Sequence, residues 1–144
     1  MRNFEQLLTM VAAFLVVGVI VAVFLIRRPK KLKVDRFVAS WKELQGLCRD
    51  KATWPEAVIQ ADKLLDVALK KRKLRGKTMG ERLVSAQRLF NDNDDTWFAH
   101  NLAKKLKANN DKPLKESDVR DALMGFRQAL RDVGALPASD KDRI

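Results

Sequence analysis

Few residues of this chain have the chemistry that catalysis requires. His100 is its only histidine and Cys48 its only cysteine. A nucleophilic serine needs a general base within hydrogen-bonding reach, and no histidine lies close in sequence to any serine. The serines are Ser40, Ser85, Ser117 and Ser139. A glycine-rich phosphate loop is also missing from the sequence, so we predict a non-enzymatic protein in which His100 is a hydrogen-bonded structural residue.

Acidic residues gather in one loop, residues 91–95, which reads Asn-Asp-Asn-Asp-Asp. A calcium loop of the EF-hand type also needs a central glycine and a distant bidentate glutamate, and this loop has neither. The carboxylate pairs Asp94–Asp95 and Asp118–Asp121 are better interpreted as loop and helix-capping residues. We therefore predict no metal site and no cofactor.

Positive charge is the strongest chemical signal, with a formal net charge of +11. Lysine and arginine are concentrated in two blocks, Arg27–Arg36 and Lys70–Lys77. Three interpretations stay open: a solvated surface with topology signals, contact with anionic lipid worth about 1 kcal/mol per cation, and phosphate contacts to nucleic acid. The residues expected to contact an anionic surface are Arg27, Arg28, Lys30, Lys31, Lys70, Lys71, Arg72, Lys73, Arg75 and Lys77.

One stretch, Leu7 to Ile26, has no charged residue, and its only polar side chain is Thr9. As a helix it would be about 30 Å long, which matches the hydrocarbon thickness of a bilayer. A cleaved signal peptide would have a shorter apolar region and a small-residue cleavage site. We also considered a pilin-type leader and a buried core helix, and we favour a transmembrane anchor over residues 1–28.

The flanks of the anchor differ in charge. Arg2 is the only lysine or arginine before the span, whereas the basic block that begins at Arg27 follows it. Positive residues close to a span favour the cytoplasmic side. We therefore expect a single-pass protein of the inner membrane with its N-terminus outside and its C-terminal domain in the cytoplasm.

The remaining sequence predicts a helical domain over residues 34–136, after a basic linker at 29–33 and before a flexible tail at 137–144. Apolar residues recur at helical spacing from Val34 to Arg49. A second helix is expected to begin at Pro55, and Gly76 is expected to terminate it.

Two further helices and a last one complete the domain. Thr78 and Glu81 form a capping box for the third helix, and Asp95 or Thr96 is expected to cap the fourth. The last helix is expected over about Lys115–Val133, with a glycine cap after it. The predicted fold class is all-α: one transmembrane helix followed by a five-helix antiparallel bundle.

Short motifs in the second half resemble small bacterial helical proteins related to the HEPN superfamily. They are Ala61-Asp62, Leu65-Asp66, the run from Gly76 to Leu83, Trp97-Phe98-Ala99-His100, Ala129-Leu130 and Leu136. The resemblance implies a helical bundle of a kind that often binds or cleaves RNA. Catalytic members act as dimers and use an arginine and a histidine to cleave the RNA phosphodiester. This chain has Ala103 and Ala108 at those positions. It therefore looks like a degenerate member.

These observations together predict a membrane-anchored, non-enzymatic interaction module whose partners are the lipid bilayer, anionic head groups and a protein that the sequence does not name. A homodimer and nucleic acid stay open as partners. The alternative is a membrane-tethered, HEPN-like domain that binds or cleaves RNA.

Overall fold

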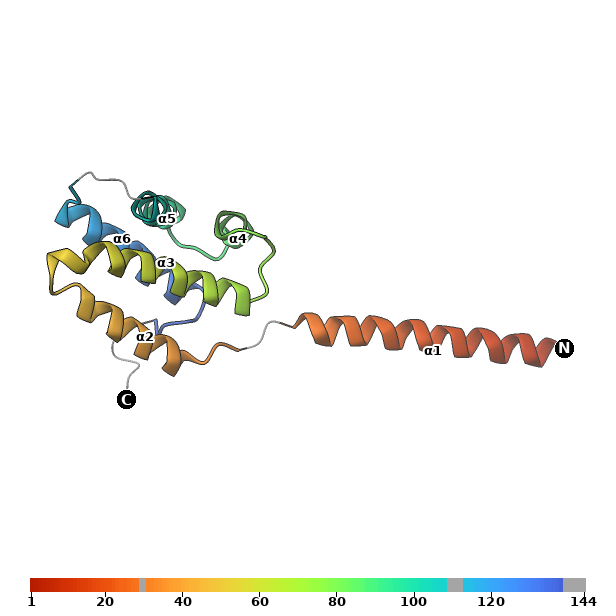
Figure 1. Cartoon of the computed structure of the whole chain (residues 1–144). Helices are drawn as coiled ribbons and strands as arrows, with labels where there is room; N and C mark the ends of the chain where they lie inside the picture. Colours follow the sequence, from red (N-terminus) through yellow and green to blue (C-terminus); the bar gives the residue numbers. More distant parts are fainter. Residues whose placement is uncertain (29–30, 109–112, 139–144) are drawn as a thin grey trace. The chain divides into compact units, whose positions relative to one another are not determined.

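The computed structural model describes residues 1–28, 31–108 and 113–138 (Figure 1). Its helices are α1 Arg2–Arg27, α2 Val34–Leu47, a 3-10 turn η1 Lys51–Thr53, α3 Trp54–Lys71, α4 Met79–Ala86, α5 Asn93–Lys107 and α6 Glu116–Asp132. Within these ranges there is no strand, which confirms the all-α class. The chain forms two compact units, Met1–Lys30 and Lys31–Ile144.

The first unit is the helix α1, which buries none of its side chains. By length and composition it is able to cross a membrane. The helix ends at Arg27, and Arg28 has the extended angles φ −60° and ψ 125°. Arg28 precedes Pro29, and the proline ring disfavours helical angles in the residue before it. Pro29 itself lies outside the described residues.

The second unit is built around α3, which packs against α2, α4, α5 and α6. Small and branched side chains cover one face of this helix and are fully buried: Ala57, Val58, Ala61, Leu65, Ala68 and Leu69. Alanines at three of these positions let the neighbouring helices approach closely. Pro55 stands in the first turn, as predicted, where its missing N–H has no helical partner in any case.

The end of α3 differs from the prediction. The residue in the left-handed conformation is Lys73, with φ 58°, and Leu74 N–H donates to the Leu69 carbonyl at 3.2 Å. This is a Schellman cap built on a lysine, so α3 ends before Gly76. Gly76 also has a positive φ, 145°, and a Cβ there would lie 2.7 Å from Arg82 N. Gly76 was therefore correctly singled out, but its role is different from the predicted one. It allows the chain to approach α4 closely and does not end α3.

Helix α4 begins at the predicted cap. Thr78 Oγ1 accepts from Glu81 N–H at 3.2 Å, and Glu81 Oε2 accepts from Lys77 N–H at 2.6 Å. Helix α5 begins earlier than predicted, because the capping side chain is Asp92, which accepts from Asp95 N–H at 2.9 Å. The prediction of Asp95 or Thr96 as the cap was wrong. Asp92 directly precedes the first turn of α5. The N–H groups of that turn have no partner within the helix, and the Asp92 side chain accepts from one of them.

Helix α6 ends as predicted at a glycine cap. Gly134 has φ 77°, and Ala135 N–H donates to the Leu130 carbonyl at 2.8 Å. Leu136 folds back and is buried. Within α6, Gly125 faces the first turn of α5, where a Cβ would lie 2.8 Å from the Asp95 carbonyl oxygen. This glycine sets the distance between α5 and α6.

The helices of the second unit do not all run along one axis. Figure 1 shows α2 and α3 lengthwise, whereas α4 and α5 are seen nearly end-on. The predicted five-helix antiparallel arrangement is therefore not confirmed. The predicted tail over 137–144 lies almost entirely outside the described residues, which reach residue 138.

The Thr78 cap provides a test of helix α4. Thr78→Ala removes the oxygen that accepts from Glu81 N–H and should lower the free energy of unfolding of the domain by about 0.5–2 kcal/mol. Ser117→Ala, an exposed position in the first turn of α6 where Lys115 is the N-cap, should change it by less than about 0.5 kcal/mol. Denaturant unfolding measures both, and equal midpoints would contradict the role of Thr78.

Candidate functional site: a buried ion-pair network and a groove between two helices

Two carboxylates lie one turn apart on α3 and are turned into the domain. The Asp62 side chain is 2% exposed, and its Oδ1 lies 2.8 Å from His100 Nδ1 on α5. Its Oδ2 accepts from Lys107 Nζ, also on α5, at 2.7 Å. A buried carboxylate needs such partners because an unpaired charge in the interior is costly. Asp62 therefore joins α3 to α5 at two points.

The second carboxylate, Asp66, joins α3 to α4. Its Oδ1 accepts from Arg82 Nε at 2.6 Å, and its Oδ2 lies 2.7 Å from Lys70 Nζ. Arg82 is itself buried and also donates to the Gly76 carbonyl at 2.7 Å. Burial raises the pKa of the Asp66 carboxyl, but hydrogen bonds and charges of Arg82 and Lys70 outweigh burial and hold the pKa below its ordinary value.

The surroundings of His100 bear on its chemistry. The ring is 6% exposed and makes an edge contact with Trp97, with ring centroids 6.0 Å apart. The prediction that His100 is hydrogen-bonded within the fold is confirmed by its contact with Asp62. Of the two alanines at the expected catalytic positions, Ala103 is fully buried and Ala108 is exposed at the end of α5.

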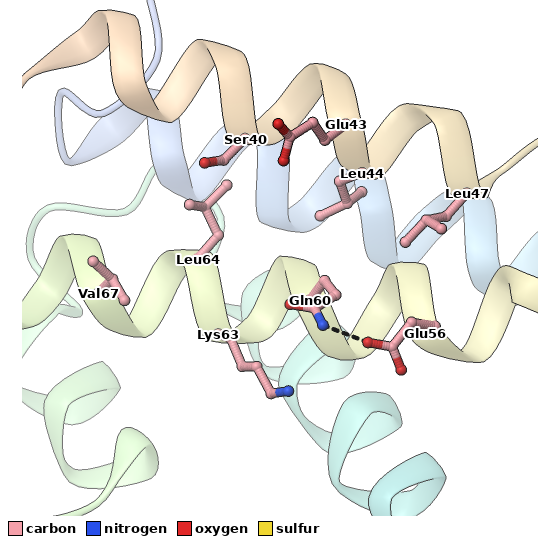
Figure 2. Close-up of a pocket in the computed structure, with 9 residues that line it drawn as sticks. All are labelled: Ser40, Glu43, Leu44, Leu47, Glu56, Gln60, Lys63, Leu64 and Val67. Atoms are coloured by element: carbon pink, nitrogen blue, oxygen red, sulfur yellow. Dashed lines mark hydrogen bonds between the residues drawn. The ribbon is translucent and has the colours of Figure 1, made fainter.

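A groove runs between α2 and α3 (Figure 2). It encloses about 600 Å³, which is within the range of ligand pockets. Its residues are Ser40, Glu43, Leu44 and Leu47 from α2, and Glu56, Gln60, Lys63, Leu64 and Val67 from α3. In Figure 2 the leucines point into the space between the two helices, and Lys63 extends along α3 away from α2. The sequence analysis did not single out this groove.

A second pocket of about 420 Å³ lies between α2 and α6, lined by Trp41, Trp54 and Leu123 among others. Trp54 Nε1 donates to the Cys48 carbonyl at 3.0 Å. Trp41 Nε1 is buried and has no hydrogen-bond partner within the part of the chain that the structure describes. Burial raises the pKa of the Cys48 thiol above its ordinary value, which disfavours the reactive thiolate.

The structure describes every basic residue that was predicted to contact an anionic surface except Lys30. Lys70 is paired with Asp66, and Lys71 Nζ lies 5.5 Å from the centre of the Phe37 ring. Arg72 is half-buried, whereas Arg75 and Lys77 are exposed. Arg27 and Arg28 belong to the unit of α1 and Lys31 to the other, and all three are exposed. The block Lys70–Lys77 is thus less uniform than its sequence indicates.

The ion pair between Asp66 and Arg82 should be visible in the pH dependence of stability. Asp66→Asn leaves buried Arg82 without its carboxylate and should lower the free energy of unfolding at neutral pH by about 1.5–3 kcal/mol. Because the folded-state pKa is lowered, the carboxylate stabilises the fold above its unfolded pKa. That contribution is lost as the pH falls through the folded value.

The difference between wild type and Asp66→Asn should therefore narrow below about pH 4. The control is Asp121→Asn, whose side chain is 61% exposed and 3.9 Å from Arg120. This variant should change the free energy of unfolding by less than about 0.5 kcal/mol. Chemical denaturation across this pH range measures both, and a pH-independent difference for Asp66→Asn would contradict the role of the ion pair.

Comparison of the chain with family models, curated proteins and solved structures finds no match.

Proposed function

We propose that this protein is a single-pass, non-enzymatic interaction module of the inner membrane, with its helical domain, residues 34–136, on the cytoplasmic face. The observation that carries the proposal is α1. Its 26 residues bury none of their side chains, and it forms a compact unit apart from the domain. A helix of this length and composition is stable in a bilayer, where its backbone groups are paired internally.

The domain supports an interaction role. Its α2–α3 groove exposes an apolar lining between charged rims, and Val67 is 42% exposed in it. Apolar concave surfaces with polar rims are typical of binding sites. The single histidine supports the non-enzymatic part of the proposal, since its ring is buried and its Nδ1 contacts Asp62.

Anionic lipid is the second expected partner. Arg27 and Arg28 directly follow the apolar part of α1, and basic residues continue to Lys33 and Arg36. Cations next to a span are attracted to the anionic inner leaflet. In this proposal the block that ends with Arg75 and Lys77 adds to that attraction.

The alternative function is a membrane-tethered domain that binds or cleaves RNA. The observation that favours it is the contact between His100 and Asp62, because an aspartate that orients an imidazole is a common arrangement for a general base. Lys107 shares the same carboxylate, which favours a structural pair instead. A homodimer also stays open.

The topology provides the test of the proposed function. A reporter fused after Ile144 should be active in the cytoplasm and should remain in the membrane fraction after alkaline extraction. Replacing Arg27, Arg28, Lys30 and Lys31 with glutamine should weaken this orientation, since flanking cations set it. Cleavage of the C-terminal reporter by protease added outside intact cells would contradict the proposal.

An RNA assay separates the alternative. Purified full-length protein in detergent should leave single-stranded RNA intact. His100→Asn is the matched variant, because asparagine still donates a hydrogen bond to Asp62 but has no titratable ring. RNA cleavage by the wild type that disappears in His100→Asn would establish the alternative and overturn the non-enzymatic proposal.

A further inference from the structure

The groove between α2 and α3 extends beyond the part shown in Figure 2. A smaller pocket of about 190 Å³ shares Ser40, Leu64 and Val67 with it and continues to Arg36, Phe37 and Lys71. The two pockets therefore form one continuous groove along the helix pair. Its apolar lining comes from both helices and includes Phe37, Leu44, Leu47, Leu64 and Val67.

Charged residues lie along this groove. Arg36 and Lys71 lie at one end, and Glu56 lies at the other, with Glu43 and Lys63 between them. All five residues are exposed. Within the described part of the chain none of the five has an ion-pair partner. The groove therefore has two cations at one end, a carboxylate at the other end, and one charge of each sign between them.

We propose that the groove binds an amphipathic helix of a partner protein, whose first turn is acidic and whose last turn is basic. This assignment rests on the proposed interaction function and names the chemistry of the partner. The acidic turn lies against Arg36 and Lys71, and the basic turn lies against Glu56. Its apolar side chains fill the space between the leucines of α2 and α3, as amphipathic helices do in apolar grooves.

The helix dipole fixes the direction of the bound helix. Acidic residues stabilise the N-terminus of a helix and basic residues its C-terminus. The partner's N-terminus therefore lies at the end with Arg36, near the start of α2, and its C-terminus lies near Glu56 at the start of α3. The bound helix runs parallel to α2 and antiparallel to α3, because α3 begins near Glu56 and ends at Lys71.

The length of the groove sets the length of the partner helix. Glu56 and Lys71 are fifteen positions apart on α3, which corresponds to about 22 Å along the helix axis. A partner helix of about 15 residues spans that distance. Its apolar residues must recur at three- and four-residue steps to keep facing the groove.

A lipid chain matches this groove less well than a helix. An acyl chain has one polar head group and offers nothing to the charged residues at the opposite end. A helix with oppositely charged ends satisfies both ends at once. Charge complementarity of this kind selects the partner and its orientation.

The test uses the full-length protein in nanodiscs of neutral phosphatidylcholine, with empty nanodiscs as the blank. Two fluorescent 16-residue peptides share one composition and one apolar face, and both are stapled so that they are helical. The matched peptide has glutamates in its first turn and lysines in its last turn, and the reversed peptide has them exchanged. Fluorescence anisotropy should show at least tenfold tighter binding of the matched peptide.

Two sets of variants test the site. Val67→Glu places a charge in the groove and should weaken binding of the matched peptide at least tenfold. Val84→Glu, at an exposed valine of α4 (53%, against 42% for Val67), should leave it unchanged. Exchanging the end charges, with Arg36→Glu and Lys71→Glu together with Glu56→Lys, should reverse the preference between the peptides. Circular dichroism checks that each variant is folded.

Several results would overturn the proposal: equal binding of the two peptides, no binding of either, or equal weakening by Val67→Glu and Val84→Glu. If the protein self-associates in sedimentation, neither peptide binds and Val67→Glu abolishes the association, then a second copy occupies the groove. These outcomes are distinguishable from failure of the membrane proposal, because topology and alkaline extraction are measured separately from peptide binding.

Discussion

Pairing of two carboxylates that face into the domain is the constraint on which its arrangement depends. Asp62 and Asp66 occupy successive turns of α3, with 2% and 18% of their side chains exposed. Each needs a partner because a charge removed from water is costly when it is unpaired. Asp62 obtains its partners from α5 and Asp66 obtains Arg82 from α4. The central helix thus fixes both neighbours by directional contacts, whereas its alanine-rich face supplies close but non-directional packing. This division explains why α4 has a fixed position although it has only eight residues.

Much of the fold could be predicted from the sequence because its signals are local. The spacing of apolar residues, the Thr78 cap and the Gly134 cap each involve residues within a few positions of one another. The misassigned ends are also informative. Lys73 adopts the left-handed angles at the end of α3, a conformation that sequence rules reserve for glycine. Asp92 caps α5 although four other residues with acceptor side chains follow it directly, and only the backbone path decides among them.

The contacts that define the candidate site could not be predicted in the same way. Asp62 and His100 are 38 positions apart, and Asp62 and Lys107 are 45 apart, so their contact depends on the packing of α3 against α5. The groove was missed for a different reason. Leu47 and Leu64 belong to apolar stripes that predict burial, yet they line an open surface. A stripe shows which face of a helix avoids water, but it does not show whether the chain itself covers that face.

The proposed partner helix meets two kinds of groove residue, and the two kinds act on different steps of binding. Charges at a rim mainly control the association rate and its salt dependence. Arg36 and Lys71, which are exposed at one end of the groove, therefore act mainly on how fast the helix binds. The apolar lining, which includes Leu64 and Val67, leaves water when the helix is seated, and it determines how long the helix stays bound.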